Sequence, residues 1–130
     1  MSVKIFEWKT IVSEASRLWI KKLLYDGELT VFCGAIFDQN EKEIKISFGE
    51  RPIYRDIQEE FLTPLWKIKD SLPQKIGWTF FLEQSKWLEE LNKDDFFAAL
   101  RKGSRHYVLT TDDDVIEVVT DFEPIFTVVS

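Results

Sequence analysis

The chain has 130 residues, of which 45% are hydrophobic and 31% charged, and its formal net charge is −6. This length is typical of one domain, and the large apolar fraction excludes an intrinsically disordered chain. The negative charge repels phosphate backbones and anionic lipid surfaces, so neither nucleic acid nor a membrane is an expected partner.

The same features predict the cellular location. No stretch approaches the roughly 20 apolar residues that a membrane-spanning helix needs. The first residues also lack the apolar core and cleavage site of a signal peptide. Cys33 is the only cysteine, so it has no partner for a disulfide within the chain. We therefore predict a cytoplasmic protein.

The first predicted element is an amphipathic helix over about residues 6–25. Apolar residues recur there at the 3.6-residue spacing of a helical stripe, which favours a helix packed on a core. They are Trp8, Ile11, Val12, Ala15, Leu18, Trp19 and Leu23. Gly27 is expected to end this helix, because glycine adopts the left-handed conformation beyond a helix C-terminus at least cost.

A β-hairpin is predicted next. Residues 29–37 are apolar on both alternating faces, which favours a strand covered on both sides. Residues 44–48 alternate apolar and polar side chains, as does a strand with one exposed face. The polar residues 38–42 are expected to form the turn between them.

A second helix is predicted over about residues 56–72. Its apolar residues again keep helical spacing, and Asp56 with Glu59 resembles a capping box. Pro64 interrupts the pattern because proline lacks a backbone N–H and clashes with the preceding turn. Either the helix kinks there, or Thr63 caps a separate helix with Pro64 in its first position.

Another strand and two short helices follow in the prediction. Residues 76–82 are rich in aromatic side chains, which favours a strand. Ser85 and Asp94 are expected to cap the two helices. The second helix should turn its large apolar side chains inward and stop at Gly103. Those side chains are Phe96, Phe97 and Leu100.

The remaining residues, from His106 onward, predict three strands, the first two joined by an acidic turn. The last of these strands, over residues 125–129, has little to protect its edge. An exposed edge offers unpaired backbone groups, so this strand must pair inside the fold, be covered, or meet another subunit. A homodimer that continues the sheet through the C-terminal strand is therefore one expected assembly.

The order of these elements predicts the fold class. Strands are grouped in hairpins and do not alternate with helices, which favours an α+β fold over a parallel wound sheet. We predict a single α+β domain over residues 1–130, with an antiparallel or mixed sheet of about five or six strands packed by helices. No repeat, low-complexity tract or linker indicates a domain boundary.

The sequence carries no motif that specifies a reaction. Phosphate-binding loops, nucleotide fingerprints, zinc-finger spacing and the G-x-S-x-G elbow are absent, so no cofactor and no metal are expected. His106 is the only histidine. A neutral imidazole beside carboxylates can act as a base near neutral pH, but one histidine entering a strand is more often a packed residue. A nucleophilic pair with Cys33 is disfavoured, because nothing flanking the thiol activates it.

Acidic residues gather near the C-terminus, and they are the most distinctive surface feature that the sequence predicts. The spacing of a calcium-binding loop is absent there, and consecutive acids in a hairpin usually form a solvated turn. A negative surface attracts basic partners and excludes anionic ones. The candidate partner-binding residues are Asp112, Asp113, Asp114, Glu117 and Asp121.

Two functions stay open from sequence alone. The favoured one is a non-enzymatic protein-interaction domain whose acidic surface binds a basic protein, as an inhibitor or immunity-type partner of a toxin or nuclease would. The alternative is a small-molecule-binding or enzymatic domain with an aromatic-lined pocket near His106. A deep cavity beside His106 with two convergent acids would favour the alternative, and a filled core would count against it.

Overall fold

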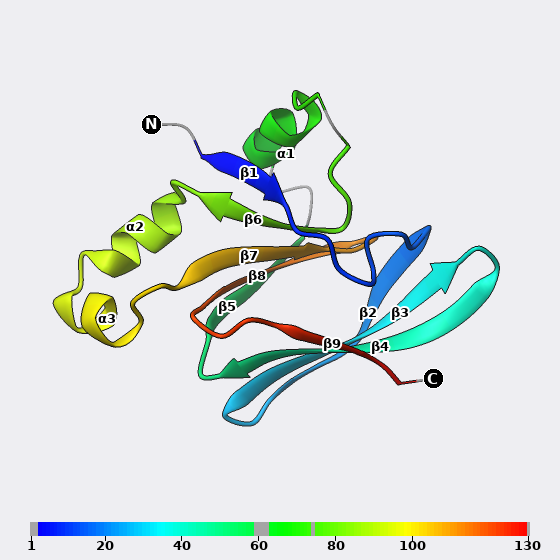
Figure 1. Ribbon diagram of the computed structural model, residues 1–130, viewed down its shortest axis with the longest axis horizontal. Coiled ribbons are helices and arrows are strands. Elements are labelled where there is room, and N and C mark those ends of the chain that lie inside the picture. The colour runs from blue at the N-terminus through cyan, green and yellow to red at the C-terminus, as the bar shows by residue number, and fades with distance from the viewer. Residues whose placement is uncertain (1–2, 59–62, 74, 130) are drawn as a thin grey trace.

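The computed structural model describes residues 3–58, 63–73 and 75–129. Within these residues, nine strands form two antiparallel sheets, and three short helices pack beside them (Figure 1). The predicted α+β class is therefore wrong, because sheet packs on sheet and the helices are minor elements. The predicted single sheet of five or six strands is replaced by one sheet of five strands and another of four.

The five-stranded sheet combines the N-terminal strand with four strands that follow β4 in the chain. Its neighbours all run antiparallel, and the β7–β8 hairpin lies near its centre. In spatial order the strands are β1 (Lys4–Glu7), β6 (Thr79–Glu83), β7 (Arg105–Thr110), β8 (Asp114–Thr120) and β5 (Ile53–Gln58).

The four-stranded sheet is a meander of three consecutive strands to which the C-terminal strand is added. The C-terminal strand β9 pairs with β4 and occupies an edge of this sheet. In spatial order the strands are β2 (Arg17–Tyr25), β3 (Glu28–Phe37), β4 (Asn40–Glu50) and β9 (Ile125–Val128).

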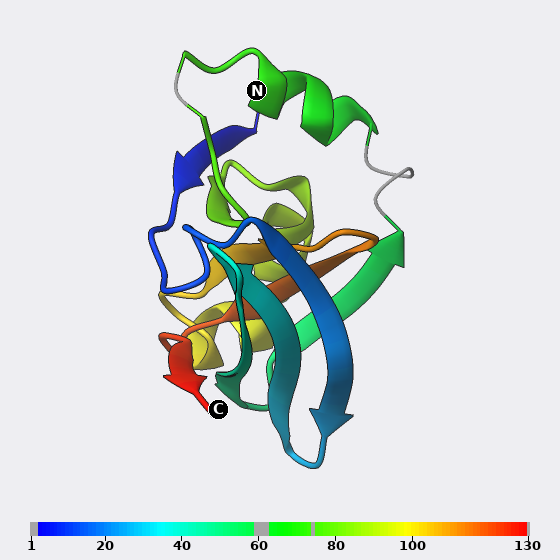
Figure 2. The ribbon, with the colours of Figure 1, turned by 90° about the vertical axis from the view of Figure 1, so that its right-hand side faces the viewer.

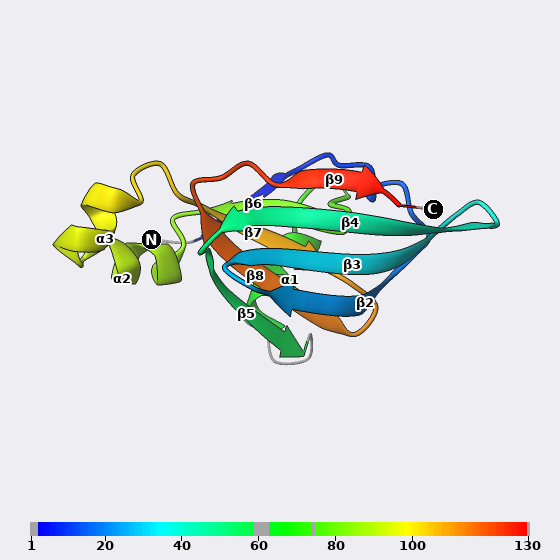
Figure 3. The same cartoon turned by 90° about the horizontal axis from the view of Figure 1, so that it is seen from below.

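The main core lies between the two sheets (Figure 3). Alternate residues of β3, such as Val31 and Cys33, point into it and are fully buried. They meet Leu109, Ile116 and Val118 of the five-stranded sheet. Burial of apolar surface contributes roughly 25 cal/mol per Å², so this interface is the principal source of stability.

A second core lies on the opposite face of the five-stranded sheet. Helix α1 (Thr63–Asp70) covers it, while strands β2 to β4 lie on the other side of the same sheet (Figure 2). Phe80 and Val108 pair in register and are fully buried beneath apolar side chains of α1 and of the turn after it. These side chains are Leu65, Trp66, Ile68 and Leu72.

The N-terminal region is not a helix, contrary to the periodicity prediction for residues 6–25. Strand β1, a loop and strand β2 occupy it. Pairing between β2 and β3 shifts register between Ile20 and Lys22, which leaves Lys21 as a bulge. A bulge reverses the alternation of side chains along a strand. Leu18, Ile20 and Leu23 therefore all reach the main core, and their spacing imitates that of a helical stripe.

The outer face of the four-stranded sheet is only partly covered, although β3 was predicted to be covered on both sides. Phe32 and Ile36 on this face are half-buried. Trp19 pairs with Gly34 and lies across it, so that a Cβ atom on Gly34 would collide with the indole ring. The absence of a side chain at Gly34 thus lets the indole of Trp19 pack directly on the backbone of β3.

The helix predicted over residues 56–72 is much shorter. Asp56 belongs to strand β5, so the predicted start of the helix is wrong, and Thr63 is the first residue of helix α1, not the residue that precedes it. Asp56 therefore caps no helix, and its suggested partner Glu59 lies outside the described residues. Strand β6 begins at Thr79, three residues later than predicted.

Helices α2 (Lys86–Asn92) and α3 (Asp95–Leu100) project from one end of the sheets (Figure 3). Their predicted N-caps are confirmed, because the Ser85 side chain accepts from Leu88 N–H and the Asp94 side chain accepts from Phe97 N–H. The predicted inward orientation of Phe96 is wrong, since its exposed fraction is 75%. Leu100 is also exposed, and Phe97 is half-buried.

None of the helices among the described residues is both long enough and apolar enough to span a membrane.

Candidate functional site

The β7–β8 hairpin carries most of the residues singled out in the sequence, and the sheet separates them into three groups. Asp112 and Asp113 lie in the turn, with Asp114 at the start of β8. Glu117 lies in the middle of β8 and is buried. Its side chain lies on the face of the five-stranded sheet that points away from the four-stranded sheet. Asp121 follows the other end of β8, so it does not join the acids of the turn.

The first of the three turn acids is held by the protein's own arginine. Arg17 Nε donates to Asp112 Oδ2 at 2.8 Å, and a second guanidinium nitrogen approaches the same oxygen at 2.5 Å. The backbone N–H of Asp112 donates to the Leu18 carbonyl, which ties the turn to β2. The carboxylate beside Arg17 raises the pKa of that guanidinium. Asp112 is therefore neutralised within the chain.

Asp114, at the end of the turn, lies close to a carboxyl group from a different strand. Asp56 of β5 and Asp114 of β8 lie diagonally across their strand pair and share a hydrogen bond. Partial burial, the negative charge of Asp114 and this hydrogen bond raise the pKa of Asp56. Asp113 is exposed next to them. We call Asp56, Asp113 and Asp114 the acidic turn.

Glu117 is not on the surface: its exposed fraction is 2%, and it belongs to a buried polar network. His106 Nε2 lies 2.8 Å from Glu117 Oε1, and Arg55 Nε donates to Glu117 Oε2 at 2.6 Å. Burial alone would raise the pKa of Glu117, but hydrogen bonds and charges from His106 and Arg55 outweigh it and lower that pKa. Glu117 is thus held as a carboxylate.

The network continues through His106 to Ser85. His106 Nδ1 lies 2.6 Å from Ser85 Oγ, and Ser85 Oγ also accepts from Leu88 N–H. An ionised carboxylate only accepts hydrogen bonds, so the His106 nitrogen facing Glu117 carries hydrogen. In the neutral ring, Nδ1 then accepts from the Ser85 hydroxyl. Every member of the chain of hydrogen bonds is satisfied.

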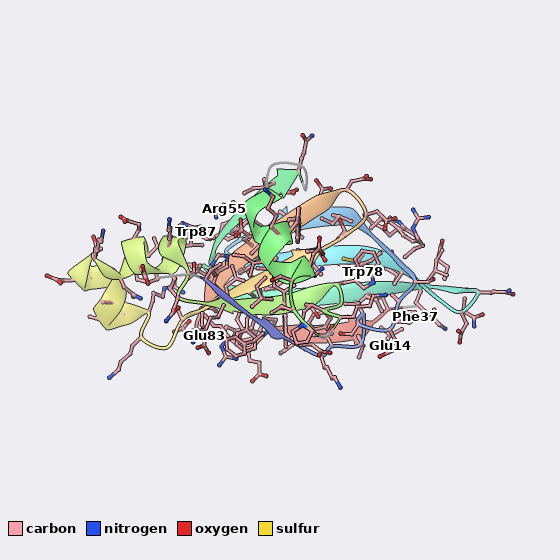
Figure 4. All side chains as sticks on the ribbon, turned by 90° about the horizontal axis from the view of Figure 1, so that it is seen from above. Glu14, Phe37, Arg55, Trp78, Glu83 and Trp87 are labelled. Atoms are coloured by element: carbon pink, nitrogen blue, oxygen red, sulfur yellow. The ribbon has the colours of Figure 1, made fainter. Side chains whose placement is uncertain are left out.

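Trp87 closes this network from helix α2. Its ring lies 4.1 Å from the Arg55 guanidinium carbon and meets the His106 ring edge-on, at a centroid distance of 5.4 Å. Figure 4 shows Arg55 and Trp87 side by side at the base of α2. A guanidinium on an indole face gains about 0.5–2 kcal/mol. Trp87 thus fastens α2 to strands β5 and β7.

Serine, imidazole and carboxylate in series also occur in nucleophilic hydrolases, where the base activates the hydroxyl. Here the exposed fraction of Ser85 is 3%, and one lone pair of Oγ is committed to Leu88 N–H. A substrate carbonyl therefore cannot reach Oγ in this arrangement. The network instead joins strands β5, β7 and β8 to the start of α2.

Asp121 and Cys33 lie apart from these groups. Asp121 Oδ1 lies 3.8 Å from Arg101, a loose surface ion pair. Cys33 points between the two sheets, whereas His106 lies on the outer face of the five-stranded sheet, so the two do not meet. Burial raises the pKa of the Cys33 thiol to about 12. Neither residue forms part of a reactive group.

A cleft lined by tryptophan is present, but His106 is not one of its residues. Its volume is about 620 Å³, and it lies between α1, the β1–β2 loop and the segment before β6. Trp66 and Trp78 contribute to its walls, and Thr110 and Thr111 line it from the end of β7. Among the described residues, no group of three or more His, Cys, Asp and Glu side chains is placed to hold a metal ion.

No protein-family model matches the chain, and neither the curated proteins nor the solved structures contain a significant match to it.

Nothing in the local sequence marks Arg55 or Trp87 as part of this network, and Ser85 is recognisable there only as a helix cap. Arg55 was placed just before a helix, although it pairs in register with Glu117 on the neighbouring strand. Oppositely charged residues at facing positions of two strands stabilise a sheet. Recognition of β5 as a strand would have indicated this pair.

Proposed function

We propose that this chain is a non-enzymatic interaction domain that binds a basic protein through the acidic turn. The observation that carries the proposal is the position of Asp56 and Asp114, which lie diagonally across neighbouring strands beside the exposed Asp113. The negative charge of Asp114 raises the pKa of Asp56, because two ionised carboxyl groups close together repel each other, and a cation placed beside them relieves this repulsion. A lysine or arginine of a partner would supply that cation.

The distribution of charge within the turn supports this assignment. Arg17 neutralises Asp112, so Asp112 contributes to positioning the turn and less to attracting a partner. Asp113 and Asp56 are exposed, and Asp114 is partly exposed. Of the five acids predicted from the sequence, Asp113 and Asp114 thus remain the best candidates for contact.

The net charge of the chain adds a long-range contribution. A charge of −6 steers a basic protein toward the domain and excludes nucleic acid from the same surface. Inhibitors of basic toxins or nucleases bind by this physical principle, and an inhibitor or immunity-type role is the specific form of the proposal. Such steering raises association rates by 10- to 1,000-fold, and salt weakens it.

The test compares two variants that lose equal charge at different places. In one variant, Asp56, Asp113 and Asp114 become asparagine. In the control, three exposed acids elsewhere are neutralised by E41Q, E89Q and D95N. Each protein is immobilised and exposed to an extract of its source organism at low and high salt. The retained basic proteins are then identified.

The expected result is a basic protein that the natural chain and the control retain at low salt and that the acidic-turn variant releases. Its association rate with the acidic-turn variant should fall at least tenfold, with a flatter dependence on salt. If the two variants retain the basic protein equally and have equal association rates, the acidic turn is not its binding surface.

A second candidate is self-association through β9. This strand is an edge of the four-stranded sheet, and Ile125 and Val128 on it are about half exposed. Lysine at an edge opposes strand addition. Light scattering over a range of protein concentrations should therefore give a dimer for the natural chain and a monomer for the I125K/V128K variant. A monomer at all concentrations of the natural chain would exclude this assembly.

A further inference from the structure

Strand β5 has a free edge. Among the described strands it is the last of the five-stranded sheet, and it pairs with β8 alone. Figure 3 shows β5 at the border of that sheet. The edge of an antiparallel sheet leaves the N–H and C=O groups of every second residue unpaired. Within the described part of the chain, no backbone hydrogen bond outside the sheet pairing involves residues 53–58, so these outward groups can accept another strand.

The edge at β5 is also the least protected edge of the two sheets. Natural edge strands are protected by short length, bulges, lysine or proline. Strands β1 and β9 have four residues each, and β2 carries the Lys21 bulge followed by Lys22. Strand β5 has six residues, pairs with β8 without a register shift, and contains neither lysine nor proline. An added strand would therefore find its longest regular edge at β5.

One side of β5 is acidic. Asp56 pairs in register with Ile116 of the main core, so its side chain lies on the side of the four-stranded sheet. Gln58, opposite Asp114, lies on the same side two residues further along. Asp56 and Gln58 are exposed, and Asp114 is partly exposed. On this side, the free edge of β5 therefore runs beside the acidic turn.

The opposite side of β5 is mostly apolar, and its arginine is neutralised. Ile53 and Ile57 are half-buried on this side. Arg55 lies between them, where its guanidinium group is bound by Glu117 and lies over the Trp87 ring. The two sides thus favour different residues in an added strand. Basic residues fit toward the four-stranded sheet, and apolar residues fit on the side that faces away from it.

We propose that the basic partner adds an extended segment to β5, as a sixth strand of this sheet. This inference rests on the proposed function and specifies how the partner binds. Backbone hydrogen bonds to β5 hold the segment, as in other domains that bind peptides by strand addition. Alternate Lys or Arg side chains of the segment meet Asp56 and Asp114, and the residues between them are apolar. An acidic segment is excluded, because like charges at facing positions destabilise a sheet.

The test uses a synthetic peptide with blocked ends, Thr-Lys-Val-Lys-Val-Lys-Val-Thr, and the full chain labelled with nitrogen-15 for NMR. Two control peptides carry N-methyl groups on alternate residues, one set of residues in each peptide. In an added strand only one set of N–H groups points at β5. Methylation of that set prevents pairing, whereas methylation of the other set leaves it intact. A third control peptide has glutamate in place of every lysine.

We expect the parent peptide and one methylated peptide to bind, and the other methylated peptide and the glutamate peptide not to bind. Hydrogen exchange of the outward N–H groups of β5 should slow about tenfold in the complex, while exchange in β1, β2 and β9 stays unchanged.

Protein variants test the charge. The variant with asparagine at Asp56, Asp113 and Asp114 should bind the parent peptide about tenfold more weakly, because exposed charge pairs each contribute modestly. The matched control with E41Q, E89Q and D95N loses equal charge elsewhere and should bind like the natural chain.

Four outcomes would overturn strand addition. The first is that the two methylated peptides behave alike; if their binding still depends on the acidic turn, charge alone explains it and the proposed function stands. The second is that the protected amides belong to a different edge. The third is that the parent peptide does not bind at millimolar concentration. The fourth is that β5 is protected without peptide, in a dimer of the chain. Capture from extract tests the proposed function separately, so strand addition can fail while a basic partner is still found.

Discussion

His106 and Glu117 lie diagonally across strands β7 and β8, with His106 Nε2 2.8 Å from Glu117 Oε1 and both side chains almost fully buried. Removal of one partner from a buried charged pair leaves the other without compensation. The carboxylate of Glu117 is therefore expected to be the most costly charge to lose in this protein.

Glu117→Gln should lower the free energy of unfolding by about 2–3 kcal/mol at pH 7, less than the 3–5 kcal/mol of a fully buried pair, because Arg55 is partly exposed. The pKa of Glu117 is lowered in the fold, so its stabilisation is present above the ordinary value of 4.5 and is lost as pH falls through the lowered value. Urea unfolding from pH 7 to 3 should show the two curves converging. A constant difference would contradict this prediction.

Asp56→Asn should have the opposite effect on stability. The pKa of Asp56 is raised in the fold, so ionisation of this carboxyl costs stability as pH rises through the raised value. The asparagine variant should therefore be more stable than the natural chain at pH 7 and equal to it in acid. Thermal unfolding at both pH values checks this. Stability gained together with partner binding lost would identify the acidic turn as a functional surface.

Ser85→Ala should destabilise the protein more than Asp94→Ala does. Both changes remove an N-cap, at about 0.5–2 kcal/mol each. Ser85 is also buried and bonded to His106 Nδ1, which the alanine would leave without a partner at a further cost of about 1–3 kcal/mol. Urea unfolding at pH 7 measures the difference. Equal losses would mean that the bond to His106 contributes nothing.

The thiol of Cys33 should be unreactive in the folded protein. It is fully buried between the sheets, and its pKa is raised to about 12, so almost no thiolate forms at pH 8. A disulfide reagent such as 5,5′-dithiobis(2-nitrobenzoate) should modify it only at the rate of unfolding. Rapid modification without denaturant would show that the main core opens readily.

Phe96→Ser should change the free energy of unfolding by no more than about 0.5 kcal/mol, because the side chain is 75% exposed on α3. Phe80→Ala is the comparison: Phe80 is fully buried under α1, and its truncation should cost about 3–5 kcal/mol. Chemical unfolding of both variants provides the measurement. A large loss for Phe96→Ser would place that side chain in a packed environment.

Local signals in the sequence were reliable where one residue determines the local geometry. Ser85 and Asp94 were identified as N-caps because their side chains accept the backbone N–H groups that every helix leaves unpaired at its start. The C-terminal strands were identified because β-branched residues fill them. These features need no knowledge of distant neighbours.

Features that depend on pairing between distant strands could not be predicted from the local sequence. The bulge at Lys21 exists because β2 pairs with β3, and it gives a strand the periodicity of a helix. The position of Asp56 within a strand depends on β8, which lies far along the chain. The burial of Glu117 depends on Arg55, His106 and Trp87 being brought together by three different elements. No local pattern specifies any of these neighbours.

The topology also sets an order of events during folding. The meander β2–β3–β4 joins neighbouring strands, so it can form while the chain is still being synthesised. The five-stranded sheet cannot form before β7 and β8 are synthesised, because these strands lie near its centre. They begin only at residue 105. Loop closure between distant segments slows folding. We therefore expect the apolar face of the meander to stay uncovered until these strands emerge, and a chaperone would have most opportunity to bind it during that time.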